Sequence, residues 1–195
     1  SSGAYYGHGQ IGAGAPAESF MSAMWYPFED AILRYDSKWP AVTGARGRVE
    51  VHNGSAVVSV EQANSGGLQL RPSTVRLVTD NESPVVSVKI AAQVPAKAVD
   101  LWMKDSPLRE VVGDGLSQIS FTGSADLNLA LRLPLNQPRQ FSVDALVAAS
   151  DVGLQHLPSG LKWTQIRGQA RYRSKQGFSG APMQGVFEGQ PVTIG

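Results

Sequence analysis

The clearest pattern in this sequence is ADLNLALRLPL, at residues 125–135. Apolar residues occupy every odd position of this stretch, and Asp126, Asn128 and Arg132 lie between them. Alternation with a period of two is typical of a β-strand with one apolar face and one wetted face, whereas a helix needs apolar residues three or four positions apart. We therefore predict a long strand here, with a ladder of leucines along one side.

The same alternation appears in the segments on both sides of this strand. Residues 84–94 carry apolar side chains at every second position, and the pattern returns after a turn at residues 136–138. We predict that one apolar surface is lined by ten residues: Val86, Val88, Ile90, Leu127, Leu129, Leu131, Leu133, Val143, Ala145 and Val147. A register shift of one residue would move each side chain to the other face, so these assignments depend on one another.

Other segments complete a β-rich pattern. Asn53-Gly54 is a strong hairpin signal between the alternating segments 49–52 and 56–60. Further strands are predicted at 31–35, 68–70, 75–79, 170–173, 178–180, 184–188 and 192–194. Residues 96–103 have helical spacing, Ser106-Pro107 is a favoured helix start, and residues 20–28 could form a turn or two. The expected fold is all-β, with one to three short helices.

Two architectures are compatible with strands that have one apolar face and one polar face. A second sheet could cover the leucines, which gives a β-sandwich. Alternatively, one curved antiparallel sheet could leave the leucines lining an open groove. Alternation does not separate these two arrangements, because both need one apolar face and one polar face.

Composition excludes several classes of function. Lys and Arg total 17 against 16 Asp and Glu, a net charge of +1 that gives no electrostatic footprint for nucleic acid. The chain has no cysteine, which excludes disulfides, thiolate metal sites and cysteine nucleophiles. No run of 18 apolar residues predicts a membrane span, and residues 1–17 lack the charged start and apolar run of a signal peptide. Any export signal is therefore expected outside this chain.

The sequence divides into a Gly/Ala-rich leader or linker at 1–19 and a repeating β segment at 20–195. The repeat is visible in residues 42–51, which match residues 163–172 in Thr, Arg and Gly after a shift of 121 from Val42 to Trp163. Each copy leads into a hairpin and then a glycine-bearing segment. We predict a repeating β architecture that is part of a longer protein.

Enzymatic activity is not expected. His8, His52 and His156 lie far apart without metal-ligand spacing, so we expect no metal, no cofactor and no catalytic base. His156 with Asp151 and Ser159 could suggest a triad, but no nucleophile elbow accompanies them. Four tryptophans leave one alternative open, a β-sandwich that binds carbohydrate or serves as a structural envelope module.

An ordered set of motifs resembles a known family. The set comprises Trp39-Pro40, Ser106-Pro107-Leu108 after a short helix, Thr122-Gly123 before the leucine ladder, Leu133-Pro134-Leu135, Leu157-Pro158 and a strand containing Gly168. This succession, over residues 31–195, resembles the repeating segment of YhdP-type proteins, relatives of AsmA and TamB in Gram-negative bacteria.

The resemblance implies a fold and a function. It implies an elongated, strongly curved β-sheet in the periplasm, joined to neighbouring segments of the same chain and to an inner-membrane anchor outside this fragment. The apolar groove of such a bridge-like protein carries phospholipid, held by its acyl chains, between the inner and outer membranes. On this resemblance the open groove is favoured over the sandwich, and the ten residues named above are expected to line it.

Overall fold

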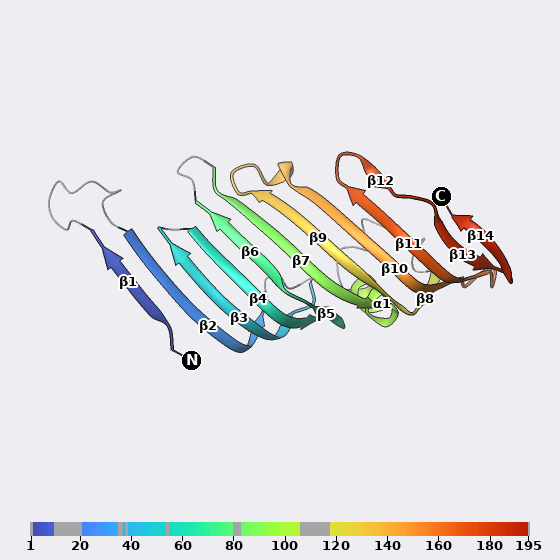
Figure 1. Cartoon of the computed structure of the whole chain (residues 1–195), viewed down its shortest axis with the longest axis horizontal. Coiled ribbons are helices and arrows are strands. Elements are labelled where there is room, and N and C mark those ends of the chain that lie inside the picture. Colours follow the sequence, from blue (N-terminus) through green and yellow to red (C-terminus); the bar gives the residue numbers. More distant parts are fainter. Residues whose placement is uncertain are drawn as a thin grey trace.

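The computed structural model describes residues 2–9, 21–34, 37, 39–53, 55–79, 83–105 and 118–194. The strands of this part form one antiparallel sheet of 14 strands. They lie side by side along the long axis of the molecule, from β1 near the N-terminus to β14 near the C-terminus (Figure 1). The structure confirms the predicted all-β class with a large curved antiparallel sheet.

The strands are mostly long, which suits a sheet that needs many backbone hydrogen bonds. Their bounds are β1 Ala4–His8, β2 Met21–Leu33, β3 Val42–His52, β4 Ser55–Ser65, β5 Leu68–Leu70, β6 Ser73–Val78, β7 Val85–Pro95, β8 Ile119–Thr122, β9 Ser124–Pro134, β10 Ser142–His156, β11 Lys162–Arg173, β12 Gly177–Ser179, β13 Met183–Phe187 and β14 Gln190–Ile194. The helix α1 spans Ala96–Asp105, and Pro138–Gln140 forms a 3-10 turn.

Strand order follows chain order closely. The main path is β1-β2-β3-β4-β5-β7-β9-β10-β11-β13-β14, with β6 paired to β4 and β7, β8 paired to β10, and β12 paired to β11. Short connections join most of the antiparallel neighbours, whereas residues 96–123, with α1 and β8, lie between β7 and β9 in the chain. Because all described strands belong to one sheet, the β-sandwich alternative is wrong for the described part of the chain.

The N-terminal part differs from the sequence-based expectation in two places. Residues 21–28, expected to include a helical turn, belong to the 13-residue strand β2. Pro27 fits this strand because it lies beyond Trp25, the last residue that pairs with β1, so β2 is an edge strand there. Within residues 1–19, expected to be a leader or linker, Ala4–His8 forms strand β1 and pairs with β2.

Helix α1 confirms the helix expected at residues 96–103. The second helical turn expected at Ser106-Pro107 falls outside the described residues. The hairpin predicted at Asn53-Gly54 is supported by the pairing of His52 with Ser55 across the turn.

The repeat detected in the sequence extends to backbone geometry. In β2, register shifts separate Phe28, Ala31 and Leu33, and in β10 they separate Ala149, Val152 and Leu154, each 121 positions later. Gly44 and Gln165, also 121 apart, both have positive φ, at 59° and 53°. Bulges and left-handed residues re-aim a strand locally, so their recurrence means that both copies bend at the same points.

Little of the molecule is a conventional core. The buried apolar residues among those described are small for the most part: Ala45, Ala63, Leu68, Ala92, Ala98 and Ile166. No described large side chain is less than 2% exposed. The sheet is one layer thick, so its stability rests on the strand ladders and on cross-strand contacts along each face.

Candidate functional site

The register of β7, β9 and β10 places the ten predicted residues on one side of the sheet. Leu131 pairs with Val88 on one side and Val143 on the other, and Leu129 pairs with Ile90 and Ala145 in the same way. The remaining predicted residues also pair directly, as Val86 with Leu133 and Leu127 with Val147. Directly paired residues point to the same side, so these side chains share a surface, which we call the apolar face.

The apolar face extends beyond the predicted residues. Val88 pairs with Val75 of β6, Val75 with Val58 of β4, and Val58 with Val49 of β3, which pairs with Tyr26 of β2. One row of apolar side chains therefore crosses seven strands, from Tyr26 to Val143. With about 4.8 Å between neighbouring strands, this row is about 29 Å long. Sequence reasoning missed its N-terminal half, although the period-two pattern was present in those strands.

No second layer covers this face in the described part of the chain. Leucines 127, 129, 131 and 133 are half-buried, and Val147 is 39% exposed. In a sandwich core, such side chains would be almost fully buried against a facing sheet. The apolar face is therefore accessible from solvent.

Helix α1 closes one end of the strands. Ala98, 2% exposed, lies against the turn between β4 and β5, where a Cβ on Gly67 would meet the Ala98 Cβ at 3.2 Å. The indole Nε1 of Trp102 donates a hydrogen bond to the Ser65 carbonyl oxygen at 3.0 Å, and its ring packs edge-on against Trp39 at 5.6 Å. These contacts fix α1 to the sheet.

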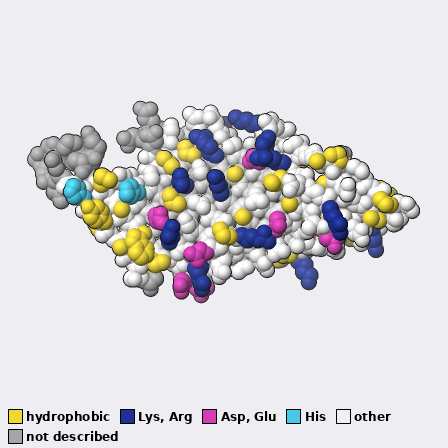
Figure 2. All heavy atoms as spheres, in the orientation of Figure 1, with side chains coloured by type: hydrophobic (Ala, Val, Ile, Leu, Met, Phe, Trp, Pro, Cys, Tyr) yellow, Lys and Arg dark blue, Asp and Glu magenta, His cyan; other side chains and the backbone are white. Residues whose placement is uncertain are grey.

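The other side of the sheet carries the charges, and we call it the polar face. Asp126, Asn128 and Arg132 lie on it, because they alternate with the leucines of β9. Dark blue Lys and Arg side chains gather over the middle of the face shown in Figure 2, among fewer magenta carboxylates. Among the described residues, three ion-paired groups lie on this face: Arg48 with Glu50, Arg71 with Asp126, and Asp144 with both Arg171 and Arg173.

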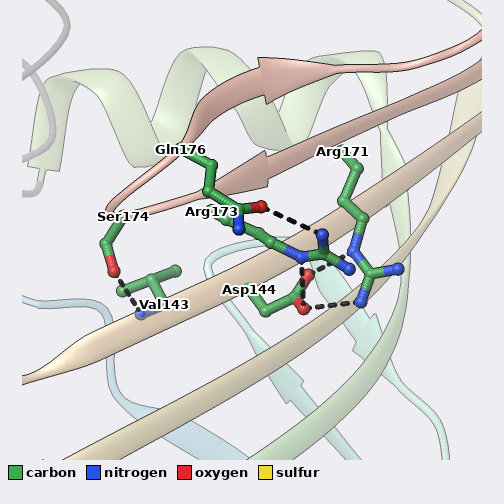
Figure 3. Close-up of polar contacts among 6 residues, drawn as sticks. All are labelled: Val143, Asp144, Arg171, Arg173, Ser174 and Gln176. Carbon is green, nitrogen blue, oxygen red and sulfur yellow. Dashed lines mark hydrogen bonds and ion pairs between the residues drawn. The ribbon is translucent and has the colours of Figure 1, made fainter.

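The Asp144 cluster is the most connected of these groups (Figure 3). The Arg171 Nε and Nη2 donate to the two carboxylate oxygens at 2.6 and 2.5 Å, and the Arg173 Nε donates to Oδ2 at 3.2 Å. The hydrogen bonds from Arg171, with help from Arg173, lower the pKa of Asp144 to about 2. No sequence-based expectation named Asp144, whose arginine partners lie 27 and 29 residues away along the chain.

Two shallow hollows lie beside this cluster. One, of about 380 Å³, is lined by Ser87, Lys89, Ala130, Arg132, Ser142, Asp144, Arg173 and neighbouring residues. The other, of about 410 Å³, shares Lys89, Ala130 and Asp144 and adds Arg171. The small side chain of Ala130, between larger neighbours, leaves room for both.

The residues considered for catalysis do not assemble into a site. The His156 Nδ1, at the end of β10, lies 2.6 Å from the hydroxyl of Ser159 in the following turn, but the contact is exposed, and no described carboxylate hydrogen-bonds to the imidazole. Among the residues that the structure describes, no group of His, Asp and Glu could hold a metal ion.

The tryptophans do not form an obvious sugar platform either. Trp39 and Trp102 pack on each other, and Trp163 packs on Phe187 with ring centroids 4.8 Å apart. Trp25 is 49% exposed. The carbohydrate-binding alternative therefore gains no support from a shared aromatic surface.

Comparison with known proteins points to one family. The family described as YhdP protein matches residues 23–195. A relative in Escherichia coli (strain K12), the intermembrane phospholipid transporter YhdP, is 24% identical over 110 residues, which are 56% of this chain and 9% of that protein. No solved structure matches the chain. Within the described residues, no helix is long and apolar enough to cross a membrane.

Proposed function

The chain belongs to the YhdP protein family, and we propose that its apolar face carries phospholipid acyl chains between the inner and outer membranes of a Gram-negative cell. In this proposal the segment lies in the periplasm, within a longer protein that an inner-membrane anchor elsewhere in the chain holds in place. The curved sheet forms the trough, and residues such as Leu129 and Leu131 line it.

The apolar row from Tyr26 to Val143, which no second sheet covers in the described part of the chain, is the observation that carries this proposal. A row that crosses strands offers tails a path along the long axis of the sheet, rather than a pocket on one strand. A large exposed apolar surface is costly in water and is typical of a surface that meets a lipid or a partner. The name of the E. coli relative favours lipid.

The energy of tail binding fits such a surface. Burial of an acyl methylene contributes about 0.8 kcal/mol, so a tail of roughly 16 carbons could gain on the order of 10 kcal/mol. Aliphatic contacts are not directional, so a tail can move from one pair of strands to the next without losing specific bonds. A charged headgroup stays in water at the edge of the trough, because its burial without a partner is too costly.

The first test is chemical. Purified protein is extracted with organic solvent, and the extract is analysed by mass spectrometry. We expect phospholipid to co-purify with the parent chain. The variant Leu129→Asp places a carboxylate on the apolar face and should retain much less lipid.

A matched control keeps this test specific. The variant Asn128→Asp adds the same charge to the residue directly before Leu129 in β9, on the polar face, and should retain lipid as the parent does. Circular dichroism shows whether both variants fold. Equal lipid in the two folded variants, or no lipid in the parent, would contradict the proposal.

A further inference from the structure

Three cations gather on the polar face around one serine. Arg76 of β6 pairs directly with Ser87 of β7, and Ser87 pairs directly with Arg132 of β9. With about 4.8 Å between strands, the two arginines are anchored about 10 Å apart with Ser87 between them. Lys89 is two residues further along β7 and points to the same side as Ser87.

These cations have no partner among the described residues. No ion pair or hydrogen bond joins Arg76, Lys89 or Arg132 to a described side chain. The nearby carboxylates that the structure describes are already engaged, since Asp144 binds two arginines and Asp126 binds Arg71. Among the described residues, the site therefore has a local excess of positive charge, in a chain whose net charge is only +1.

The same place offers hydrogen-bond donors and space. The hydroxyls of Ser87 and of Ser142, which pairs with Arg132, have no hydrogen-bond partner among the described residues. Lys89, Arg132 and both serines line the hollow of about 380 Å³ above Ala130. The Asp144 carboxylate at its side is neutralised by Arg171 and Arg173, so it does not oppose a second anion strongly.

From this arrangement we propose that the polar face binds a phosphate ester between Arg76, Lys89 and Arg132. Arginine presents N–H groups in a planar fork that matches two phosphate oxygens, and lysine adds a compact charge. The serine hydroxyls donate to the remaining oxygens. The site lies on the opposite side of the sheet from the apolar face, and it does not rest on the proposed lipid path.

A soluble phosphate ester and a lipid headgroup share this chemistry, and the test separates them. The first arm titrates glycerol 3-phosphate into the chain by isothermal calorimetry at low salt. The second arm measures sedimentation of the chain with vesicles of phosphatidylglycerol, and with vesicles of phosphatidylcholine as the uncharged comparison. We expect saturable binding in at least one arm, weakened by added salt.

Variants locate the binding. Loss of one arginine, as Arg76→Gln or Arg132→Gln, should weaken binding roughly tenfold, because a charged hydrogen-bonding partner is lost. Arg46→Gln removes the same charge from an exposed position of β3 and should bind as the parent does. Leu129→Asp, which blocks the apolar face, should leave binding of glycerol 3-phosphate intact.

The two arms and the variants together separate a site for soluble phosphate esters, a site for lipid headgroups and the absence of a site. Binding of glycerol 3-phosphate that only the cluster variants weaken supports a site for soluble phosphate esters. Cluster-dependent binding to phosphatidylglycerol vesicles alone supports a headgroup site. Absence of binding in both arms, or equal loss in Arg46→Gln, overturns the proposal.

Discussion

At the scale of single residues, the side on which each side chain lies follows directly from the sequence. The leucines of β9 and their partners in β7 and β10 fall on one face because period two and an unbroken register leave no other arrangement. Residue partnerships across the polar face could not be predicted in this way. Asp144 meets arginines that are 27 and 29 residues away, and only the pairing of β10 with β11 brings them together.

The Asp144 cluster gives a prediction for the dependence of stability on pH. The ordinary pKa of 3.8 applies in the unfolded chain, and the hydrogen bonds from Arg171 lower it to about 2 in the folded chain. A lowered folded-state pKa means that ionised Asp144 stabilises the fold above about pH 4. This contribution is lost as the pH falls from about 4 to about 2.

Urea unfolding of the parent and of Asp144→Asn at several pH values between 5 and 2 measures this effect. The stability difference between the two should shrink across the window, and it should be smaller in high salt because the groups are partly exposed. Asp151→Asn, in the same strand and without an ion pair among the described residues, should follow the parent profile. Parallel profiles for the parent and Asp144→Asn would show that the ion pairs contribute nothing.

At the scale of elements, most strands and the helix α1 were predictable, and β2 was only partly so. Its first residues include Met, Trp and Tyr close together, a pattern that short helices and strands share, and Pro27 is disfavoured inside a paired strand. The edge position of β2 removes the cost of that proline, and an edge position is known only from the sheet. Strand β1 was missed for a similar reason, since its pairing with β2 is what makes it a strand.

The attachment of α1 can be measured with two glycines of nearly equal backbone conformation. Gly67 and Gly189 have φ of 82° and 83°, so alanine at either position carries a similar backbone strain of about 1–2 kcal/mol. Only at Gly67 would the new Cβ meet α1, at Ala98, whereas nothing lies within 4 Å of Gly189. Gly67→Ala should therefore lose about 1 kcal/mol more stability than Gly189→Ala.

Chemical unfolding of the two variants and the parent gives both values under the same conditions. Because the backbone strain cancels, the difference between the variants reports the fit of α1 on the turn. Equal losses would mean that α1 moves aside at no cost and does not close this end of the sheet.

At the scale of the whole molecule, a continuous lipid path along the single-layer sheet and a local binding site predict different effects of substitutions. If lipid moves along a path, a charged substitution at any point of the apolar row should stop lipid transport, wherever it lies along the sheet. Val58→Asp and Leu131→Asp lie three strand positions apart on the same row. In the full-length protein both should weaken the outer membrane of cells to a similar degree.

The control for this comparison is Ser59→Asp, on the polar face beside Val58, which should leave the outer membrane intact. Sensitivity of cells to a large antibiotic or to detergent provides the readout, with protein levels measured in parallel. Loss of function in only one of the two apolar-face variants, at equal protein levels, would favour a local site over a path.

The architecture of the whole sheet was less predictable than its strands. Alternation requires one apolar face but does not reveal whether a second layer covers it, and the family resemblance favoured the open arrangement. Much of the strand order followed from short connections, whereas the branches at β6, β8 and β12 arise because two strands share one edge of a long partner: β5 and β6 pair with β4, β8 and β9 with β10, and β12 and β13 with β11.

Because the same bends recur after 121 residues, each repeat unit adds a fixed length to the sheet. From β2 to the equivalent strand β10, the sheet advances six strand spacings, or about 29 Å. Each added unit of this kind would extend the reach of a longer chain by the same increment, and each deletion would shorten it. The number of units in the gene would then set the distance that the protein can bridge, without any change in its chemistry.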